Sequence, residues 1–568
     1  MRCEDDALEA FVTETNLPRL DAALLCGRGV SAENAETFLS PKLRSSLPDP
    51  SVMQDVDKAA ARILDGIATQ EKIWIFSDYD VDGGTSAAQM IRWGRAIGYE
   101  FKLYIPDRIK EGYGPTEEAF QSLKDQGADL VITMDCGAAA YEALHHAAEI
   151  DLSVIVVDHH LMHTDMPPAF AIVNPNRQDD SSGLGHLAAA GVTFMLIVAL
   201  NRLAKARGLS VSFDLRNLLG LTALGTICDV VPLTGVNRTF VRQGLKVLSR
   251  NDIVGIEALA DVADAKPPYS TYHAGFVLGP RLNAGGRIGR ADMGAELLST
   301  ENAQTAYAHA AELDRVNAER RAMQDKILTE ALEMGEAKKN HSVIIVAMED
   351  WHAGIIGIVA GRLKDRFGKP TIVIGIDQFG QGKGSGRSIK GVNLGGAISA
   401  AKEAGLLVSG GGHEMAGGLS IEPDKLEDFE AFMLNALSDD VALATANPSR
   451  SIDAIISVSA VNLDMLDTIE RIGPYGSGNP QPVFALADLR LSYAQRLKGN
   501  HVRFSFTDRA GQVLSGICFR ADESGLADAL LDPNPASYHV IGQIRENLWK
   551  GRRKVDFHLI DMARTKES

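Results

Sequence analysis

Residues 152–160, LSVIVVDHH, join a run of apolar residues to an acid and two adjacent histidines, Asp158, His159 and His160. The apolar part is typical of a fully buried strand, and such strands occur in parallel sheets that are covered on both faces. Ligands of open α/β sheets bind just beyond the carboxyl ends of the strands. The stretch therefore indicates a site at such an edge. The alternative from these residues alone is a surface turn with two solvated histidines.

Acids occupy a similar place in three other apolar stretches. Two strand-like segments, 72–76 and 130–134, are followed by four acids in total, and a fifth acid lies within the apolar run 221–233. The carboxyl ends of parallel strands can bring such residues to one edge of a sheet. For any single aspartate, the alternative is that it caps the next helix. The acids concerned are Asp78, Asp80, Asp82, Asp135 and Asp229.

Several carboxylates need a cation to share a small site, because like charges raise one another's pKa. Mixed carboxylate and imidazole ligands suit manganese, whereas sites made only of oxygen suit magnesium or calcium. Two metal ions about 3.5–4 Å apart commonly serve phosphoryl hydrolysis. The alternation of acids from Asp78 also suggests an EF-hand, but that loop needs a preceding helix and a glutamate where this chain has Gln89. The residues therefore predict a divalent-metal site.

The pattern around these residues predicts an α/β fold with a parallel sheet, since residues 70–235 alternate strand-like and helix-like segments. Residues 301–334 contain no Gly or Pro and predict one helix, roughly 50 Å long, that connects two lobes. A second α/β rhythm follows at 342–376, and hairpins at 501–519 and 539–561 predict a small antiparallel sheet or barrel. The apolar stripe of the connector helix is expected to contain Leu313, Val316, Met323, Ile327 and Met334.

Length, charge and cysteine content constrain the function less strongly than the motifs do. The 568 residues suggest three or four domains, and the net charge of −17 counts against a nucleic-acid partner, although a cleft can be locally positive. The most apolar segment, 187–200, is too short to span a bilayer and predicts a buried helix. Five scattered cysteines without a CxxC pair argue against a disulfide scaffold and fit a reducing cytosol: Cys3, Cys26, Cys136, Cys228 and Cys518.

DYDVDG (78–83) and VDHH (157–160) together resemble the DHH phosphoesterases. Further stretches narrow the likeness to the RecJ family of single-strand-specific DNA exonucleases, and the resemblance extends from about Leu20 to the C-terminal sheet. Those stretches are GPRLNAGGRIG (279–289), WHAGIIGIVAGRL (351–363), GSGRSIKGVNL (384–394), SGGGHEMAGG (409–418) and PYGSGNPQPVF (474–484).

The resemblance implies a domain order and a set of metal ligands. Asp135 is expected to bridge two Mn²⁺ or Mg²⁺ ions, with Asp78 and His160 at the edge of the site and Asp158 orienting a histidine. The ligand and catalytic positions that carry over are Asp80, Asp82, Asp135, His159 and Asp229, with His160 added to the catalytic set. The expected domains are an N-terminal segment packing on the catalytic lobe (1–69), a DHH catalytic domain (70–299), a connector helix (300–340), a DHH-associated (DHHA1) domain (341–445) and an OB-like nucleic-acid-binding domain (446–568).

Substrate contacts are expected from glycines, which let backbone N–H groups approach a phosphate, and from arginines, which bind phosphates in a bidentate manner. We expect Arg281, Ser385 and Arg387 to grip a 5′-phosphate; the alternatives are solvated cations or arginines paired with carboxylates between the lobes. Trp549, Lys550, Arg552 and Arg553 are weaker candidates in the barrel, where Trp549 could instead pack in a hairpin. The candidates for substrate binding are Arg281, Asn283, Arg287, His352, Ser385, Arg387, Gly411, Gly412 and His413.

By resemblance, the activity is stepwise 5′→3′ hydrolysis of single-stranded DNA to mononucleotides, in DNA repair and recombination. The implied enzyme is a cytoplasmic monomer that contacts no membrane, with a single-strand-binding protein and a helicase as partners by family analogy. One alternative is a small-substrate DHH enzyme acting on cyclic dinucleotides, very short RNA or pyrophosphate, but it would not need the C-terminal β module. Another is a non-catalytic DNA-binding scaffold, which would have lost carboxylates that are present here.

Overall fold

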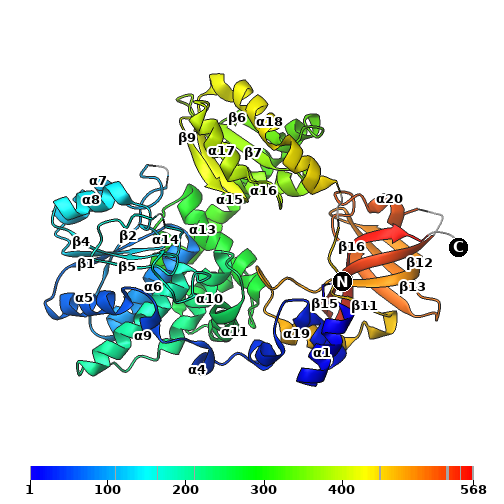
Figure 1. Ribbon diagram of the computed structural model, residues 1–568, viewed down its shortest axis with the longest axis horizontal. Coiled ribbons are helices and arrows are strands. Elements are labelled where there is room, and N and C mark those ends of the chain that lie inside the picture. Colours follow the sequence, from blue (N-terminus) through cyan, green and yellow to red (C-terminus); the bar gives the residue numbers. More distant parts are fainter. Residues whose placement is uncertain are drawn as a thin grey trace. The chain divides into compact units, whose positions relative to one another are not determined.

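The computed structural model (Figure 1) describes residues 2–108, 110–162, 164–209, 211–446, 449–532, 536–549 and 552–565. The chain forms two compact units. Unit 1 comprises Met1–Gly286, Arg290–Leu313 and Ser451–Ser568, and unit 2 comprises Arg287–Gly289 and Asp314–Arg450.

A parallel sheet of five strands forms the centre of the first part of unit 1, in the order β2-β1-β3-β4-β5. Alternate residues of its strands face two different cores. Ile75, Ile132 and Ile155 belong to one core, and Trp74 and Val154 to the other. The strands are β1 (Ile73–Ser77), β2 (Lys102–Tyr104), β3 (Leu130–Met134), β4 (Ser153–Val157) and β5 (Ala171–Val173).

Helices cover both faces of this sheet. The first core is shared with α5 (Val56–Ala68), α6 (Val81–Ala96) and α9 (Ala189–Ala206), and the second with α7 (Glu117–Asp125) and α8 (Tyr141–Glu149). Helix α9 is long and apolar enough to cross a membrane by length and composition, but 72% of it is buried inside the protein, as in a core helix. The doubly covered parallel sheet confirms the predicted α/β fold.

A helical layer follows the sheet, and its helix α10 packs against α6, α9 and α11. The contact with α6 needs Gly225, because a Cβ there would lie 2.4 Å from Thr85 Oγ1 and 2.6 Å from Asp82 Oδ1. This contact brings the start of α6 beside α10. The layer consists of η3 (Leu215–Leu218), α10 (Leu219–Cys228), α11 (Gly235–Leu248), α12 (Val254–Val262), the π-helix η4 (His273–Leu278), α13 (Gly279–Ile288) and α14 (Met293–Ser299).

The long helix α15 (Ala303–Ala337) begins in unit 1 and continues into unit 2. Its 35 residues correspond to about 52 Å at 1.5 Å per residue. Leu313 is buried in a core of unit 1 and Ile327 in a core of unit 2. Met323, predicted in the same apolar stripe, is 43% exposed, whereas Val316 is 3% exposed.

Unit 2 contains a second five-stranded sheet, in the order β6-β7-β8-β10-β9, in which only β6 and β7 pair in parallel. Its elements are β6 (Ile344–Glu349), α16 (Ala353–Phe367), β7 (Thr371–Ile376), β8 (Gly382–Arg387), α17 (Leu394–Glu403), β9 (Ser409–His413), β10 (Ala416–Ile421), η5 (Pro423–Lys425) and α18 (Leu426–Thr445).

The C-terminal strands form a small closed barrel within unit 1, as the alternating sequence predicted. Strand β12 pairs with both β13 and β15, which closes the order β12-β13-β14-β16-β15 around a core rich in phenylalanine. The elements are β11 (Ala454–Ile455), η6 (Val458–Ala460), α19 (Leu463–Ile472), β12 (Phe484–Leu497), β13 (His501–Thr507), β14 (Val513–Cys518), α20 (Ala527–Leu530), β15 (Ser537–Trp549) and β16 (Arg552–Arg564).

The N-terminal segment contacts both parts of unit 1. Helix α5 packs against α9, whereas Leu24 of α2 is buried in the barrel core. Cys3 and Cys26 form a disulfide, which the scattered cysteines did not suggest; Cys136, Cys228 and Cys518 are free. The elements before α5 are α1 (Asp5–Thr15), α2 (Arg19–Cys26), η1 (Ala32–Asn34), α3 (Ala35–Leu39), α4 (Leu43–Ser46) and η2 (Pro50–Val52).

Candidate metal centre

The predicted acids and histidines meet at the carboxyl edge of the parallel sheet. Asp78 follows β1, Asp135 follows β3, and residues 158–160 follow β4. Asp80 and Asp82 stand at the start of α6, and Asp229 directly follows α10. The site is therefore built from three strand ends and two helix ends. The contact between α6 and α10 brings the acids at the ends of these two helices together.

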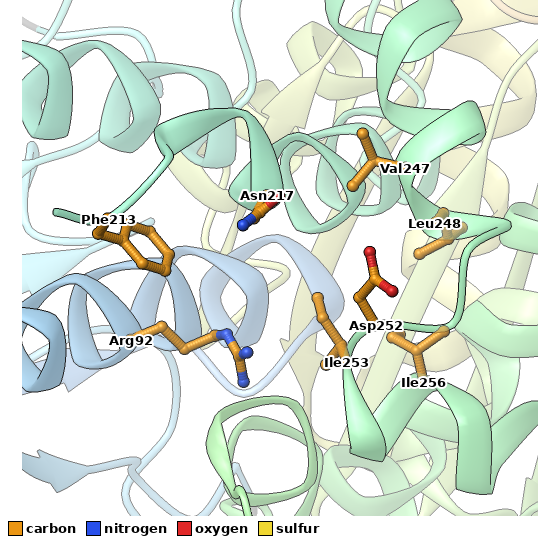
Figure 2. A pocket seen from close by; sticks show the side chains of 8 residues that line it. All are labelled: Arg92, Phe213, Asn217, Val247, Leu248, Asp252, Ile253 and Ile256. Carbon is orange, nitrogen blue, oxygen red and sulfur yellow. The ribbon is translucent and has the colours of Figure 1, made fainter.

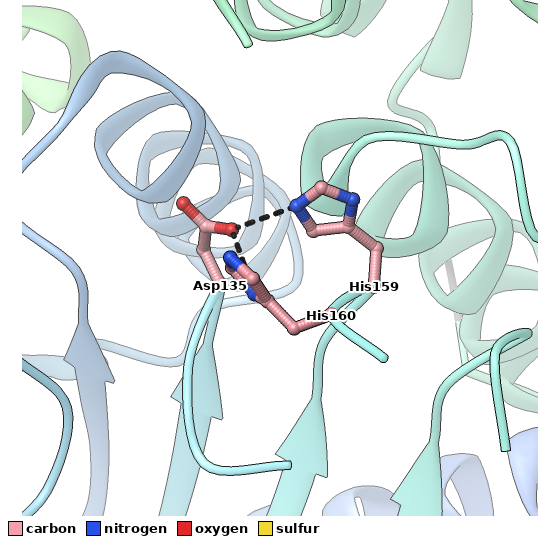
Figure 3. Close-up of side chains that lie close together, drawn as sticks. All are labelled: Asp135, His159 and His160. Carbon is pink, nitrogen blue, oxygen red and sulfur yellow. Dashed lines mark ion pairs between the residues drawn. The ribbon is translucent and has the colours of Figure 1, made fainter. Parts of the chain in front are cut away.

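His159 lies at the centre of the cluster. Its Nε2 is 3.3 Å from Asp135 Oδ1, 3.5 Å from Asp229 Oδ2 and 3.9 Å from Asp82 Oδ2. Figure 3 shows one Asp135 oxygen facing both histidine rings, and His160 Nδ1 lies 4.0 Å from this oxygen. Three overlapping groups could each hold an ion, with their donor atoms within 4.8 Å of one another: Asp135, His159 and His160; Asp82, His159 and Asp229; Asp78, Asp80 and Asp135.

Four polar atoms of this cluster are buried and have no hydrogen-bond partner among the described residues. They are Asp78 Oδ1, Asp135 Oδ1, His159 Nε2 and Asp229 Oδ2. A buried polar atom without a partner costs about 1–3 kcal/mol, so four of them in one place are a large penalty for the protein alone. Acidic oxygens and one imidazole nitrogen suit a divalent cation such as Mn²⁺, and these residues therefore fit the predicted metals.

The raised pKa values of the acids in this cluster also indicate a site for a cation. Burial, followed by the charge of Asp80, raises the pKa of Asp78 to about 8 and that of Asp229 to about 7. Burial and neighbouring acids also raise the pKa of Asp82 and Asp135. A bound cation would favour the ionised carboxylates and offset this repulsion.

Backbone N–H groups hold two of the acids in place. Asp80 Oδ1 accepts from the N–H groups of Asp82 (2.8 Å) and Gly83 (3.1 Å) and so caps α6. One oxygen of Asp80 therefore caps the helix, as the alternative interpretation expected. Asp80 nevertheless also belongs to a group that could hold a metal ion. Asp82 accepts from the N–H groups of Ala189 (2.6 Å) and Ala190 (2.9 Å) at the start of α9.

Asp158 contacts the histidines. Its Oδ1 accepts from the backbone N–H of His159 (2.7 Å) and lies 2.7 Å from His160 Nδ1, while its Oδ2 accepts from the N–H of Ala138 (2.9 Å). Burial alone would lower the pKa of His160, but the hydrogen bond and charge of Asp158 outweigh it and raise that pKa to about 9. Burial and the charge of His160 lower the pKa of His159 to about 4. The two adjacent histidines therefore differ in their protonation at neutral pH.

Two asparagines that we did not predict hold the histidine backbone. Asn176 Nδ2 donates to the carbonyl oxygens of His159 (2.5 Å) and Gly185 (2.9 Å), and Asn174 Nδ2 donates to that of His160 (2.9 Å). Asn174 also accepts from the N–H of Asn176 (2.8 Å), which links the two clamps. The sequence signal was the NPN triplet at 174–176, just after a strand-like run.

Of the substrate-binding candidates in unit 1, Asn283 contacts the start of the helix that carries Asp82 of the acid and histidine cluster. Its Oδ1 accepts from the N–H of Val81 (3.1 Å), the first residue of α6. Arg281 donates to the carbonyl oxygen of Val277 (2.8 Å). Arg553, one of the barrel candidates, forms ion pairs with Asp467, Glu470 and Glu546, so its charge is neutralised within the barrel part. Lys550 and the side chain of Trp549 lie outside the described residues.

The remaining candidates lie in unit 2. Ser385 and Arg387 stand on β8, where Arg387 donates to Ser385 Oγ (3.1 Å) and to the carbonyl oxygen of Gly386 (2.8 Å). Gly411 and Gly412 stand on β9 with His413, and β10 lies between the two strands: Gly418 is opposite both Ser385 and Gly411. His352 caps α16 by accepting from the N–H of Gly354 (3.1 Å), whose carbonyl oxygen accepts from Arg287 (3.0 Å).

A separate pocket of about 70 Å³ lies beside the C-terminal half of α6 (Figure 2). Arg92, Asn217 and Asp252 line it together with apolar residues, and no member of the acid and histidine cluster takes part. Ligand pockets usually measure about 300–1,000 Å³, so this one is too small for a nucleotide.

Three family models match the chain: the DHH family N-terminal domain over residues 72–226, the DHHA1 domain over 340–439 and the RecJ OB domain over 452–561. The single-stranded-DNA-specific exonuclease RecJ of Bacillus subtilis is 35% identical over 573 residues, covering 99% of this chain and 70% of that protein. Its namesake from Salmonella typhimurium is 33% identical, covering 91% of this chain and 92% of that protein.

Solved structures agree with these sequence relatives. RecJ of Thermus thermophilus in complex with Mn²⁺ has a TM-score of 0.81 and 26% identity, covering 99% of this chain and 78% of that one. The same protein in complex with Mg²⁺ has a TM-score of 0.74 and 25% identity, covering 99% of this chain and 77% of that one.

Proposed function

Since the chain belongs to the RecJ family of single-stranded-DNA-specific exonucleases, we propose that it removes mononucleotides stepwise from the 5′ end of single-stranded DNA. It is a metal-dependent nuclease of the DHH type, and the related structures hold Mn²⁺ or Mg²⁺. We propose the 5′→3′ direction of hydrolysis, the mononucleotide product and a role of the enzyme in DNA repair and recombination.

The observation that carries this function is the set of four buried polar atoms at the sheet edge that lack a hydrogen-bond partner among the described residues. We assign metal binding to the side chains that surround them. The family resemblance implies that Asp135 would be shared between two ions. When bound, such ions polarise a phosphodiester and lower the pKa of water. The assigned ligands are Asp78, Asp80, Asp82, Asp135, His159 and Asp229.

The residues around the ligands have separate tasks. Asp158, Asn174 and Asn176 fix the two histidines through their backbones. In the metal-free protein, burial lowers the pKa of His160, but the hydrogen bond and charge of Asp158 outweigh it and raise that pKa to about 9. We assign to His160 the delivery of a proton to the leaving oxygen as the phosphodiester bond breaks.

A strand substrate is supported by exposed aromatic rings in and next to the π-helix η4, which packs on α10. Tyr272 and Phe276 are 63% and 72% exposed, and their rings stack with centroids 5.6 Å apart. The π-helix that carries Phe276 packs on α10, where Cys228 donates to the carbonyl oxygen of Ala274. Exposed rings on such a support can stack on DNA bases. A small cyclic or dinucleotide substrate would need neither this surface nor the barrel.

In unit 2, we assign the 5′-phosphate to Ser385 and Arg387, because a hydroxyl and a guanidinium on a glycine-rich strand can bind a terminal phosphate closely. A single-strand-binding protein and a helicase are the partners that we infer by family analogy. We further propose that the enzyme works as a monomer in the cytoplasm, where its DNA substrate is found.

The direction and product are tested with one oligonucleotide labelled at either end. With Mn²⁺ and a 5′ label, the first product should be a labelled mononucleotide; with a 3′ label, a ladder of shortening strands should appear first. Asp135→Asn serves as the inactive control. A ladder from the 5′ label would reverse the direction, and labelled products longer than one nucleotide would replace the stepwise mechanism.

A further inference from the structure

We propose that the turn Gly476–Asn479 before the barrel positions the metal ligand Asp229, by holding the loop that follows it. This inference rests on the proposed role of Asp229 in metal binding. The turn lies in the stretch PYGSGN, which the proposed function leaves without a role. Both the turn and the Asp229 loop belong to unit 1.

The chain changes direction at Val230, immediately after Asp229. Val230 has a φ of 62°, in the left-handed region that a β-branched residue rarely adopts. Its side chain is 67% exposed, so it lacks the buried packing that could hold this conformation. Strained backbone persists only where its surroundings fix it, and the fixing contacts must therefore come from neighbouring residues.

The backbone N–H of Val230 donates to the carbonyl oxygen of Ile227 across 3.2 Å, and Leu233 provides a further fixing contact. Its backbone N–H donates to the carbonyl oxygen of Ser477 across 2.7 Å. Its side chain is 2% exposed and packs with Ala223 of α10 and Val241 of α11. Leu233 is thus held from two sides, by the turn and by the helices that flank Asp229.

Two glycines allow the turn to approach this closely. A Cβ on Gly478, whose φ is 70°, would lie 2.9 Å from Pro232 Cβ and 3.3 Å from Thr234 Cγ2. A Cβ on Gly476 would lie 2.8 Å from Leu233 Cδ1. Real Cβ atoms do not make contacts this short without displacing a neighbour, so a side chain at Gly478 would push the loop backbone.

The turn itself is firmly held. Gly476 and Asn479 exchange backbone hydrogen bonds, and Asn479, 1% exposed, donates to the carbonyl oxygens of Ile472 and Pro474. Arg238 of α11 donates to the carbonyl oxygens of Ile472 (2.8 Å) and Gly473 (2.7 Å). The turn can therefore transmit its position to the loop.

The experiment compares glycine substitutions in the full-length, metal-free chain. Gly478→Ala places a methyl group against the loop. Gly511→Ala is the matched control, because Gly511 has a similar φ of 79° in the same barrel part but nothing within 4 Å of its added Cβ. Mn²⁺ binding is measured by titration calorimetry, single-strand binding in EDTA by fluorescence anisotropy, and folding by thermal unfolding in EDTA.

We expect Gly478→Ala to weaken Mn²⁺ binding about tenfold or more, as changes to residues that orient metal ligands do. Its single-strand binding should equal that of Gly511→Ala, and its thermal unfolding should remain a single transition. Equal Mn²⁺ affinities in the two variants would overturn the inference. If Gly478→Ala does not fold, Gly476→Ala decides, since its φ is ordinary and its contact is with a side-chain end. A wild-type chain that bound no Mn²⁺ would instead refute the proposed function.

Discussion

Asn176 donates a hydrogen bond of 2.5 Å to the backbone carbonyl oxygen of His159, the residue whose Nε2 faces three acids. The position of that imidazole is thus fixed through its main chain, by a residue that contributes no ligand atom. Replacing Asn176 by the isosteric aspartate removes the donor and places a carboxylate against a carbonyl oxygen. We expect Mn²⁺ affinity to fall about 10- to 100-fold, measured by calorimetry.

The control for this change is Asn34→Asp, which removes a comparable donor bond, to Ser31 Oγ, at an exposed position. It should leave Mn²⁺ affinity unchanged. If Asn176→Asp bound Mn²⁺ as tightly as Asn34→Asp does, the hydrogen bond to His159 would have no part in metal binding.

Metal binding should depend on pH. In the metal-free protein, Asp78 and Asp229 have carboxyl pKa values raised to about 8 and about 7, so the folded state retains protons that the unfolded state loses. Their stabilising protonation disappears as pH rises through these values, and Mn²⁺ must displace fewer protons there. The increase in melting temperature caused by Mn²⁺ over EDTA should therefore be larger at pH 8.5 than at pH 5.5. An equal increase at both pH values would contradict the raised pKa values.

Asp135 and Asp78 should differ in their effect on activity. Asp135 belongs to two potential ligand groups, whereas Asp78 belongs to one. Loss of a shared ligand affects both ions, so Asp135→Ala should lower kcat at least about tenfold more than Asp78→Ala. Both variants should keep the circular dichroism spectrum of the wild type. Similar, mild losses would remove Asp135 from its bridging role.

Arg387→Ala should abolish a preference for 5′-phosphorylated strands. The wild type should cleave a 5′-phosphorylated strand faster than its 5′-hydroxyl counterpart, because Arg387 can form charge-assisted bonds with the terminal phosphate. Arg362→Ala, at an exposed arginine of the same unit, should retain the preference. A uniform loss of rate on both substrates would give Arg387 a general or structural role.

Truncating both exposed rings, as in Tyr272→Ala/Phe276→Ala, should raise KM for single strands and leave kcat unchanged. Base stacking is worth about 1–3 kcal/mol per base, which corresponds to roughly 5- to 150-fold. Phe379→Ala, at an 85% exposed ring in unit 2, is the control and should have no effect. An unchanged KM in the double variant would show that the DNA does not pass over these rings.

The sequence predicted those parts of the structure that depend on local pattern. The run LVITM coincides with β3, and the acids at strand ends converge because parallel strands end at one edge. Helix α6 begins at Val81, because Asp80 caps it and the glycines in its first turn remain helical.

Contacts between distant segments could not be predicted in this way. Asp229 reaches the site through the close contact of α10 with α6, which depends on Gly225 and has no periodic signal. The clamps of Asn174 and Asn176 and the disulfide of Cys3 with Cys26 likewise depend on which loops meet in space. The barrel also shares unit 1 with the sheet, so a deletion of 450–568 would expose Leu24 and could not test strand binding alone.

Because the barrel and the parallel sheet belong to the same unit, the enzyme can finish folding only after the barrel has been synthesised. Arg28 pairs with Asp453, 425 positions later, and at about 5–20 residues per second the ribosome needs roughly 20–90 s to make that partner. Throughout this time the nascent chain also lacks the turn against which Leu233 docks. An unfinished chain therefore lacks the contact that we infer holds Asp229, and the nuclease would gain its full metal affinity only near the end of translation.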